Sequence, residues 1–323
     1  MTAPDIVDRS DAVAVACSGG ADSLALAAAT VHSARRCGLL LHGLVDDHHL
    51  KTGSARVAQT AAAALRGLDC AVVRVLQTTV DGPGGLEAAA RRARYAALRE
   101  AAPPGALVLL GHTLDDQAET VLLGLGRGSG PRSVAGMREL DHPWGRPLLG
   151  VRRSVTVAAC AALELDPWAD PHNADPRFRR VRLRTEALPL LEDVLAGGVA
   201  ESLARTAGQL QEDLDVLDRQ ADELLAGALR SPQGHADSGA RGTATPGASA
   251  TAALDIAALA PAPAALRRRV LRRWLLDSGV AELTDAHLRA ADDLIGRWSG
   301  QGALRLPGNI ELVRAGGMLH VTG

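Results

Sequence analysis

The chain is poor in aromatic residues, cysteine and lysine. Phe and Tyr occur once each and Trp four times, so aromatics make up 2% of the 323 residues. The cysteines Cys17, Cys37, Cys70 and Cys160 are scattered and form no C-x-x-C pair, which argues against a zinc site, an iron–sulfur site and a secreted disulfide framework. The only lysine, Lys51, lies away from any glycine run. The sequence therefore lacks the GxxxxGKS/T loop of common nucleotide hydrolases.

Long apolar runs and a strong net charge are missing as well. No stretch reaches 18 apolar residues, and Met1–Arg9 carries early acids and no basic segment before an apolar one. This predicts neither a signal peptide nor a membrane span. We expect a cytoplasmic protein with no membrane partner, and the sequence leaves a homodimer open. The net charge of −2 does not indicate nucleic-acid binding, but the arginines are clustered, and a local basic patch is sufficient for it.

Apolar segments typical of buried strands alternate with helical segments in the first half of the chain. Strands are expected near 13–17, 39–45, 70–76 and 106–110, and helices at 24–35, 53–66, 85–100 and 115–125. This alternation predicts a doubly wound parallel α/β sheet, in which ligands bind beyond the carboxyl ends of the strands. Polar segments follow all four strands, at Ser18–Ser23, Asp46–Lys51, Gly82–Glu87 and His112–Glu119. We expect these segments at one edge of the sheet.

The second half begins with a long periodic segment and contains a low-complexity stretch. Residues 199–229 predict one long helix or two. Ser231–Ala250 is rich in Gly, Ser, Ala, Thr and Pro, which predicts a flexible insertion. Helices at 264–279 and 285–298 and strands near 303–306, 310–313 and 318–321 predict a small α+β domain. The predicted domains are residues 1–198 and 199–323, with the insertion at about 231–250 in the second.

The segment Ser18-Gly19-Gly20-Ala21-Asp22-Ser23 joins the first strand to the first helix. Adjacent glycines allow a tight turn and close approach to a ligand, and the helix start directs unpaired N–H groups and a positive dipole at an anion. A pyrophosphate group would fit there. Asp22 would repel phosphates unless Mg²⁺ bridged its carboxylate and the phosphate oxygens. The alternative is a strand-to-helix turn whose glycines serve only geometry.

Two acidic residues follow the fourth predicted strand. Asp116 and Glu119 are three positions apart, so they share one face near the start of a helix. Acidic residues in a first helical turn are ordinary partners of the helix dipole, and Asp115 could be a cap. Beside a nucleotide loop, however, two carboxylates would repel ATP unless they held a metal or the ammonium group of an amino acid. Their position favours the second interpretation.

Arginines near the same edge also allow two interpretations. Arg127 follows this helix in a glycine-rich turn that either contacts a phosphate or only ends the helix. Arg91 and Arg94 lie on one predicted helix, where neighbouring arginines usually form a solvated face. Their closeness to the ligand-binding edge favours nucleic-acid binding modestly.

The Ser18–Ser23 segment resembles the PP-loop of the N-type ATP pyrophosphatase superfamily, whose members split ATP into AMP and pyrophosphate. Further motifs in order make the chain similar to the tRNA(Ile)-lysidine synthase family. They are Val45–His48, Glu87 with Arg91, Arg94 and Tyr95, His112–Thr120, Arg127–Gly130, Arg146–Leu149, Trp168–Asp175, Arg180–Arg184 with Pro189, and Leu306–Gly308 near the end. The sequence departs from the family pattern at His49, Phe178 and Val181. We expect a short form without the further C-terminal module of long members.

The resemblance implies a PP-loop fold of the adenine nucleotide alpha hydrolase type and an ATP-dependent ligase that forms a C–N bond. Its implied partners are L-lysine and the isoleucine tRNA with the CAU anticodon, whose wobble cytidine would become lysidine. ATP and Mg²⁺ are the implied cofactors, with Asp22 as the metal ligand. The implied catalytic residues are Asp22, Asp116, Glu119 and Arg180. ATP would bind at Ser18, Gly19, Gly20, Ala21, Asp22, Ser23, His48 and His112, and lysine at Asp116, Glu119 and Arg184. The implied tRNA-binding residues are Arg91, Arg94, Arg127, Arg179, Arg182, Arg268 and Arg272.

Two other functions are consistent with the loop. A PP-loop thiolase that acts on tRNA usually carries paired cysteines, which this chain lacks. A nucleotide-binding regulatory module without turnover would need the loop, but neither Asp116 and Glu119 nor an arginine-rich second domain. Incorporation of labelled lysine into the tRNA would separate these alternatives.

Overall fold

The computed structural model describes residues 10–47, 53–78, 86–128, 130–230 and 252–322. The chain forms two compact units, Met1–Gln211 and Glu212–Gly323, which divide inside the long helix α10 (Val199–Ala228). The predicted domain boundary at 198/199 falls at the first residue of that helix. His48 and the predicted insertion at 231–250 lie outside the described residues.

A six-stranded sheet in the order β3-β2-β1-β4-β6-β5 forms the centre of the first unit. Its parallel strands are β1 (Ala12–Cys17), β2 (Leu40–Asp47), β3 (Val72–Gln77), β4 (Val108–Leu110) and β6 (Trp144–Gly145), and β5 (Leu140–Asp141) runs antiparallel at one edge. Ala14 and Val15 of β1 are fully buried, because β1 pairs with strands on both sides and is covered on both faces. The predicted parallel sheet is confirmed.

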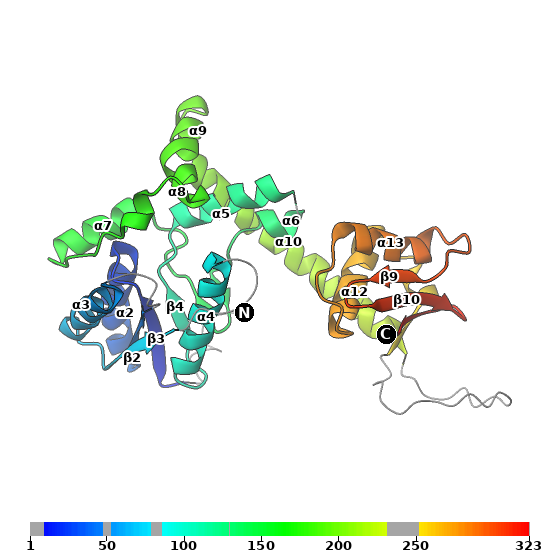
Figure 1. Ribbon diagram of the computed structural model, residues 1–323, viewed down its shortest axis with the longest axis horizontal. Coiled ribbons are helices and arrows are strands. Elements are labelled where there is room, and N and C mark those ends of the chain that lie inside the picture. The colour runs from blue at the N-terminus through cyan, green and yellow to red at the C-terminus, as the bar shows by residue number, and fades with distance from the viewer. Residues whose placement is uncertain (1–9, 48–52, 79–85, 129, 231–251, 323) are drawn as a thin grey trace. The chain divides into compact units, whose positions relative to one another are not determined.

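Helices cover both faces of this sheet (Figure 1). On one face lie α2 (Ala21–Cys37) and α3 (Ser54–Gly67), whose Leu24 and Leu65 join the apolar side chains of β1 and β2. On the other face lies α4 (Leu86–Ala101), whose Leu98 packs with Leu44 and Trp144. The helix α5 (Leu114–Arg127) begins shortly beyond β4. Because β1 to β4 are parallel, their carboxyl ends lie at one edge, and the predicted polar segments after β1 and β4 begin there; residues 48–51 and 82–85 of the other two segments lie outside the described residues.

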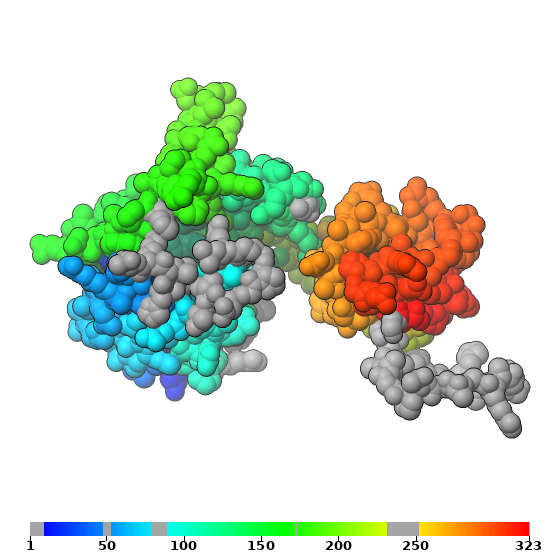
Figure 2. Space-filling model, viewed as in Figure 1, coloured from blue at the N-terminus to red at the C-terminus, as the bar shows by residue number. Residues whose placement is uncertain are grey.

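Between residues 131 and 198 the sequence predicts no element, yet the structure contains several short helices. They are α6 (Pro131–Val134), α7 (Arg153–Ala162), the 3-10 turn η1 (Pro171–Ala174), α8 (Arg179–Arg182), the π-helical turn η2 (Leu183–Ala187) and α9 (Leu188–Val194). Buried Cys160 of α7 packs into the core around α2. Figure 2 shows the α9 segment projecting from this unit, and its Leu190 and Val194 are exposed.

The second unit combines helices with a five-stranded antiparallel sheet in the order β7-β8-β11-β10-β9. Its strands are β7 (Leu229–Arg230), β8 (Ala253–Asp255), β9 (Leu304–Leu306), β10 (Ile310–Ala315) and β11 (Met318–Thr322), and its helices beyond α10 are α11 (Ile256–Leu259), α12 (Ala264–Asp277) and α13 (Asp285–Gly296). Leu271 and Leu275 of α12 are fully buried with Leu312 and Leu319 of the sheet. The predicted α+β domain is confirmed.

Two helix starts near the predicted site differ from the expectation. α2 begins at Ala21 rather than Leu24, so Asp22 lies in its first turn. The interpretation of Asp115 as a cap is wrong: α5 begins at Leu114, and Thr113 is its N-cap. Both helices therefore begin earlier than the sequence predicts, α2 by three positions and α5 by one.

Candidate active site

The loop between β1 and α2 is held by its own polar groups. Gly19 has φ +83°, a left-handed conformation that glycine adopts without strain, and an added Cβ there would lie 3.2 Å from Cβ of Ala61. The hydroxyl of Ser23 donates to the carbonyl of Gly20 over 2.9 Å and accepts from the N–H of Ser18 over 3.2 Å. The first turn of α2 has no side-chain cap. Its N–H groups are therefore available to an anion.

Asp22, in the first turn of α2, is held by two residues of α7. Nε of Arg153 donates to one carboxylate oxygen over 3.0 Å, and the hydroxyl of Thr156 donates to the other. The next turn of α7 fixes this arrangement, because Sγ of buried Cys160 donates to the carbonyl of Ala21 over 3.3 Å. Asp22 is thus set in place by a helix more than 130 positions further along the chain.

Asp116 connects the start of α5 to the same arginine. Its Oδ2 accepts from the N–H and the hydroxyl of Thr113 over 2.8 and 3.0 Å, which caps the helix. Its Oδ1 accepts from Nη2 of Arg153 over 2.6 Å. The end of β4 lies against the start of α2, since a Cβ on Gly111 would come within 3.1 Å of the Asp22 carbonyl. One guanidinium therefore bridges Asp22 and Asp116.

Glu119 is fully buried among three arginines. Nε of Arg184 donates to its Oε1 over 2.7 Å. Nη1 of Arg180 lies 3.7 Å from Oε2, and Nη1 of Arg153 lies 3.9 Å from Oε1. Oε2 accepts no hydrogen bond from the part of the chain that the structure describes. Leaving a buried acceptor unpaired costs stability, so this oxygen is a candidate acceptor for a substrate.

A π-helical turn determines where Arg184 lies. Pro189 has no N–H and cannot donate to the carbonyl four residues earlier, and the chain widens into η2 just before α9. Arg180 and Arg184 are four positions apart, so their side chains share one side of the helical segment. Both reach the carboxylate of Glu119.

Burial and neighbouring charges give these groups different pKa values. Burial acts to raise the pKa of Asp116, but the charge of Arg153 and the N–H of Thr113 outweigh it and hold that pKa below its usual range. Burial raises the pKa of Glu119, and Arg184 counters this only in part. Burial acts to lower the pKa of Arg153, but the charges of Asp116 and Asp22 raise it above its usual range. The cluster therefore combines a firmly ionised carboxylate with one that is harder to ionise.

His112 lies between the end of β4 and α5 and is neutral at pH 7. Burial lowers its pKa to about 4, opposed by the charge of Asp116 and assisted by Arg146, Arg91 and Arg94. Neither Nδ1 of His112 nor Nε of Arg146 has a hydrogen-bond partner among the described residues. Buried polar atoms in native proteins normally have partners. These two atoms therefore indicate a place where polar groups of a substrate would bind.

The arginines of α4 lie near the end of β2. Nε of Arg94 is 3.9 Å from Oδ2 of Asp46. The guanidinium of Arg91 lies 4.9 Å from the centre of the Tyr95 ring, and its Nη2 donates to the Tyr95 hydroxyl over 3.2 Å. Tyr95 in turn meets Trp144 edge to face, with ring centres 4.6 Å apart. Two of the few aromatic residues, Tyr95 and Trp144, thus pack at α4, the helix that carries the predicted tRNA-binding residues Arg91 and Arg94.

Three other predicted tRNA-binding arginines of the first unit lie outside the carboxylate cluster formed by Asp22, Asp116 and Glu119. Arg127 ends α5 eleven residues after Asp116, a distance of about 16 Å along the helix. Arg179 and Arg182 are exposed on α8, and Arg182 pairs with Glu186 over 2.8 Å. The structure does not bring these three side chains to the cluster.

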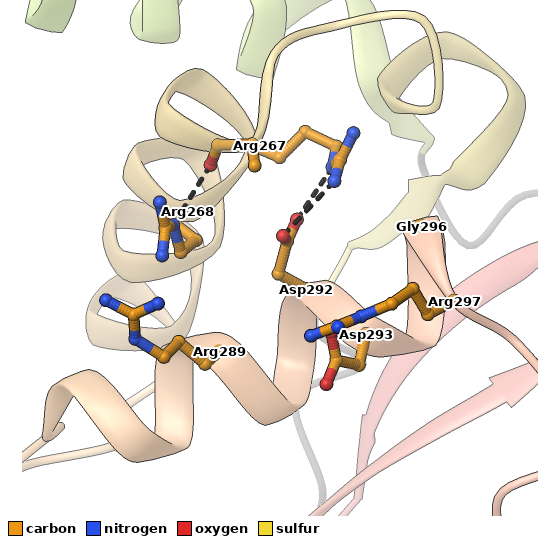
Figure 3. A pocket seen from close by; sticks show the side chains of 8 residues that line it. Arg267, Arg268, Arg289, Asp292, Asp293, Gly296 and Arg297 are labelled. Atoms are coloured by element: carbon orange, nitrogen blue, oxygen red, sulfur yellow. Dashed lines mark hydrogen bonds and ion pairs between the residues drawn. The ribbon is translucent and has the colours of Figure 1, made fainter.

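In the second unit, Arg268 borders a cleft of about 300 Å³ between α12 and α13 (Figure 3). The lining residues are Ala264, Arg267, Arg268, Arg289, Asp292, Asp293, Gly296 and Arg297. Arg267 is paired with Asp292 over 2.6 and 3.1 Å, whereas Arg268 donates to a carbonyl of its own helix over 3.2 Å. Arg272 is half-buried one turn further along α12. Arg268 therefore keeps most of its donors for a ligand.

No sequence pattern predicts a role for Arg153 or Thr156. Neither residue lies in a glycine-rich turn or directly after a predicted strand. The available signal is their place a few residues after the Arg146–Leu149 motif, which belongs to the same set of motifs as the loop.

A parallel sheet with this loop after its first strand and acidic residues beyond its fourth defines a PP-loop protein. The model of the PP-loop domain family matches residues 2–191, and that of the TilS substrate binding domain matches residues 254–320. The chain is 57% identical to the tRNA(Ile)-lysidine synthase of Nocardia farcinica over 297 residues, which are 92% of this chain and 86% of that protein. It belongs to the tRNA(Ile)-lysidine synthase family.

Two further relatives carry the same name. The protein of Rhodococcus jostii is 55% identical over 92% of this chain and 83% of its own length. That of Mycobacterium tuberculosis is 53% identical over 92% of this chain and 85% of its own length. The three proteins therefore match both units of the chain.

Among solved structures, a U34-tRNA thiolase from Methanococcus maripaludis with its 4Fe-4S cluster is similar, with a TM-score of 0.52. The two chains are 18% identical, and the match covers 65% of this chain and 75% of that one. This likeness concerns the fold alone. Separately, none of the helices in the described ranges is long and apolar enough to span a membrane.

Proposed function

We propose that the chain ligates L-lysine to C2 of the wobble cytidine in the isoleucine tRNA with the CAU anticodon. ATP would adenylate the cytidine and end as AMP and pyrophosphate, and the modified tRNA would read AUA instead of AUG. The observation that carries this proposal is the position of Asp116 and Glu119 beside the loop between β1 and α2. The identity of 53–57% to proteins named tRNA(Ile)-lysidine synthase supports it.

The first half-reaction needs a binding site for pyrophosphate. The oxygen at C2 of cytidine is a poor leaving group, so it must be adenylated before an amine can replace it. The uncapped N–H groups at the start of α2 would stabilise the negative charge on the departing pyrophosphate. Neutral His112 and Nε of Arg146, neither Nδ1 nor Nε having a hydrogen-bond partner among the described residues, would hydrogen-bond polar groups of the nucleotide or the cytidine.

The residues beside the loop fit a Mg²⁺ ion that arrives with ATP. Mg²⁺ takes one or two carboxylates and completes its shell with phosphate oxygens and water, and Asp22 supplies a carboxylate at the loop. No group of three His, Cys, Asp or Glu side chains that could hold a metal alone occurs in the described ranges. Bound there, Mg²⁺ would neutralise phosphate charge, and Asp22 would be its ligand from the protein.

The second half-reaction needs lysine with a neutral amine. The unperturbed pKa of a lysine side chain is about 10.4, so the site must position and partly desolvate the nucleophile. The ionised Asp116 and Oε2 of Glu119, which accepts no hydrogen bond from the described residues, would bind ammonium groups of the amino acid. Arg180 or Arg184 would bind its carboxylate, because a guanidinium matches a carboxylate with two parallel hydrogen bonds.

The tRNA would lie along arginines of both units. Residues 1–198 would form the catalytic domain and 199–323 the tRNA-binding domain, in which Arg268 and Arg272 of α12 would contact backbone phosphates. The planar fork of arginine suits phosphate oxygens. An enzyme that modifies this tRNA would work in the cytoplasm, where the relatives' bacterial tRNA is found.

One incubation tests the function. The purified protein is given ATP, Mg²⁺, labelled lysine and a transcript of the CAU-anticodon isoleucine tRNA, and the RNA is precipitated and counted. We expect label in the RNA and stoichiometric AMP. A transcript with the wobble cytidine changed to uridine is the control and should stay unlabelled. If the RNA stays unlabelled and instead incorporates sulfur from a sulfur donor, the thiolase alternative replaces this proposal.

A further inference from the structure

Arg153 connects two places that the proposed reaction assigns to different ligands. Its Nε contacts Asp22 beside the phosphate-binding loop, and its Nη2 contacts Asp116 in the proposed lysine site. Its Nη1 lies 3.9 Å from Glu119. The side chain is 25% exposed, so it is within reach of a ligand entering either place.

The same guanidinium competes with the cations that would bind at Asp22 and at the proposed lysine site. Lysine brings ammonium groups to Asp116 and Glu119, which are already neutralised by Arg153 and its neighbours. Charged groups at such short range in a half-buried site interact far more strongly than they do in water. Lysine would therefore bind well only after Arg153 gives up part of its contact with these carboxylates.

A nucleotide offers Arg153 another partner. A phosphate bound at the start of α2 lies beside Asp22 and hence beside the Arg153 guanidinium. Phosphate oxygens accept paired hydrogen bonds from arginine as carboxylates do. Attraction to the phosphates would draw the guanidinium away from Asp116 and Glu119.

We propose that Arg153 is a positioning residue that couples the two sites, so that bound nucleotide increases the affinity for lysine. This inference rests on the proposed function, which assigns lysine to Asp116 and Glu119. By linkage, lysine increases the affinity for nucleotide by the same factor. Coupling of this kind commonly amounts to about 5- to 150-fold, and we expect about tenfold here.

The backbone around Arg153 allows its side chain to move while α7 stays in place. The N–H of Arg153 donates to Oδ2 of Asp115 over 2.7 Å, which anchors the start of the helix. Thr156 holds Asp22 independently, and Cys160 fixes the next turn. Arg180 and Arg184 also contact Glu119, but the structure gives neither of them a contact with Asp22. Arg153 is the arginine placed to sense both ligands.

The test measures lysine binding by isothermal titration calorimetry, with and without Mg²⁺ and saturating α,β-methylene-ATP, which cannot be cleaved to AMP. For the wild type we expect the nucleotide to lower the Kd for lysine about tenfold. For Arg153→Met we expect tighter lysine binding than wild type without nucleotide, and a change of less than twofold when nucleotide is added. Arg152→Met is the matched control, because Arg152 contacts Asp115 and Glu201 instead; it should keep the tenfold ratio.

Arg153→Lys shows whether a lost response in the Met variant comes from the missing guanidinium or from a folding defect. It keeps the charge, but a single ammonium cannot span two carboxylates as the guanidinium fork does, so the ratio should fall to about threefold or less. The coupling is overturned if nucleotide leaves the Kd of the wild type for lysine unchanged, or if it lowers that Kd about tenfold in both Arg153 variants. Lysine binding itself would still be established in either case. Failure of the wild type to bind lysine in either state would overturn the lysine assignment itself and the coupling with it.

Discussion

Arg184 and Glu119 lie 65 positions apart in the sequence, and Nε of Arg184 donates to Oε1 of the fully buried Glu119 over 2.7 Å. Arg184→Met removes the shortest of three arginine contacts to that carboxylate. Because Arg180 and Arg153 remain within 4 Å, we expect the free energy of unfolding to fall by about 1–3 kcal/mol. Urea denaturation followed by circular dichroism measures this change.

Arg182→Met is the control for that measurement. Arg182 lies two positions before Arg184, but both it and its partner Glu186 are largely exposed. Exposed pairs of this kind contribute about 0–1 kcal/mol. Equal unfolding free energies for the two variants would mean that the contact with Glu119 does not stabilise the fold.

The sequence predicted the loop and the acidic pair because both follow apolar strands. A buried parallel strand is an apolar run, so the change from apolar to polar residues after Cys17 and Leu110 marks the carboxyl ends of β1 and β4. The parallel sheet then places these ends together. The same reasoning located the long helices, whose apolar faces repeat over several turns.

Arg153 could not be predicted in this way, because its contacts are not local. Its partner Asp22 lies 131 positions away, and α7 buries only Thr156 and Cys160 on its inner side, too few for a clear periodic pattern. The π-helical turn that positions Arg184 spans five residues, fewer than two helical turns and too few to show a repeating apolar face. The missed parts of the site are therefore those that depend on tertiary contacts of short elements.

Asp116→Asn should abolish lysine transfer in a protein that still folds, with a loss of about 1–3 kcal/mol from the weakened contact with Arg153. The amide keeps an oxygen that can accept from Thr113 and preserve the cap, whereas alanine would lose the cap at a cost of about 1 kcal/mol. Loss of the negative charge should weaken lysine binding at least about tenfold, or about 1.4 kcal/mol. Labelled-lysine transfer and thermal denaturation are measured together. Glu186→Gln, an exposed acid on η2, serves as control and should stay active; an active Asp116→Asn enzyme would refute the assignment.

His112 should make the fold less stable in mild acid. Burial lowers its pKa to about 4, while an unfolded histidine has a pKa of about 6.5. Between these values the unfolded state takes up a proton that the native state does not, so stability falls as pH drops from 6.5 to 4. The full difference between the two pKa values corresponds to at most about 3.4 kcal/mol. Urea unfolding at pH 7 and pH 4.5 should show a smaller loss for His112→Asn than for the wild type, and an equal loss would contradict the buried neutral state.

Arg268 and Arg272 should contribute to tRNA binding through phosphate contacts in the second unit. Changing both to Glu removes two cations from α12, so binding should weaken and the dependence of log K on log salt should become shallower by about 1.5, or 0.7–0.9 per lost contact. Filter binding of the tRNA from about 50 to 200 mM KCl, a range over which such contacts change the affinity strongly, measures this. Arg305→Glu on β9 is the control, because Arg305 is exposed and lies 3.5 Å from Glu311; it should change the slope by less than half as much. If the double variant keeps the wild-type slope, α12 does not belong to the tRNA interface. If Arg305→Glu changes the slope as much as the double variant does, the effect comes from the net charge of the protein and not from contacts of α12.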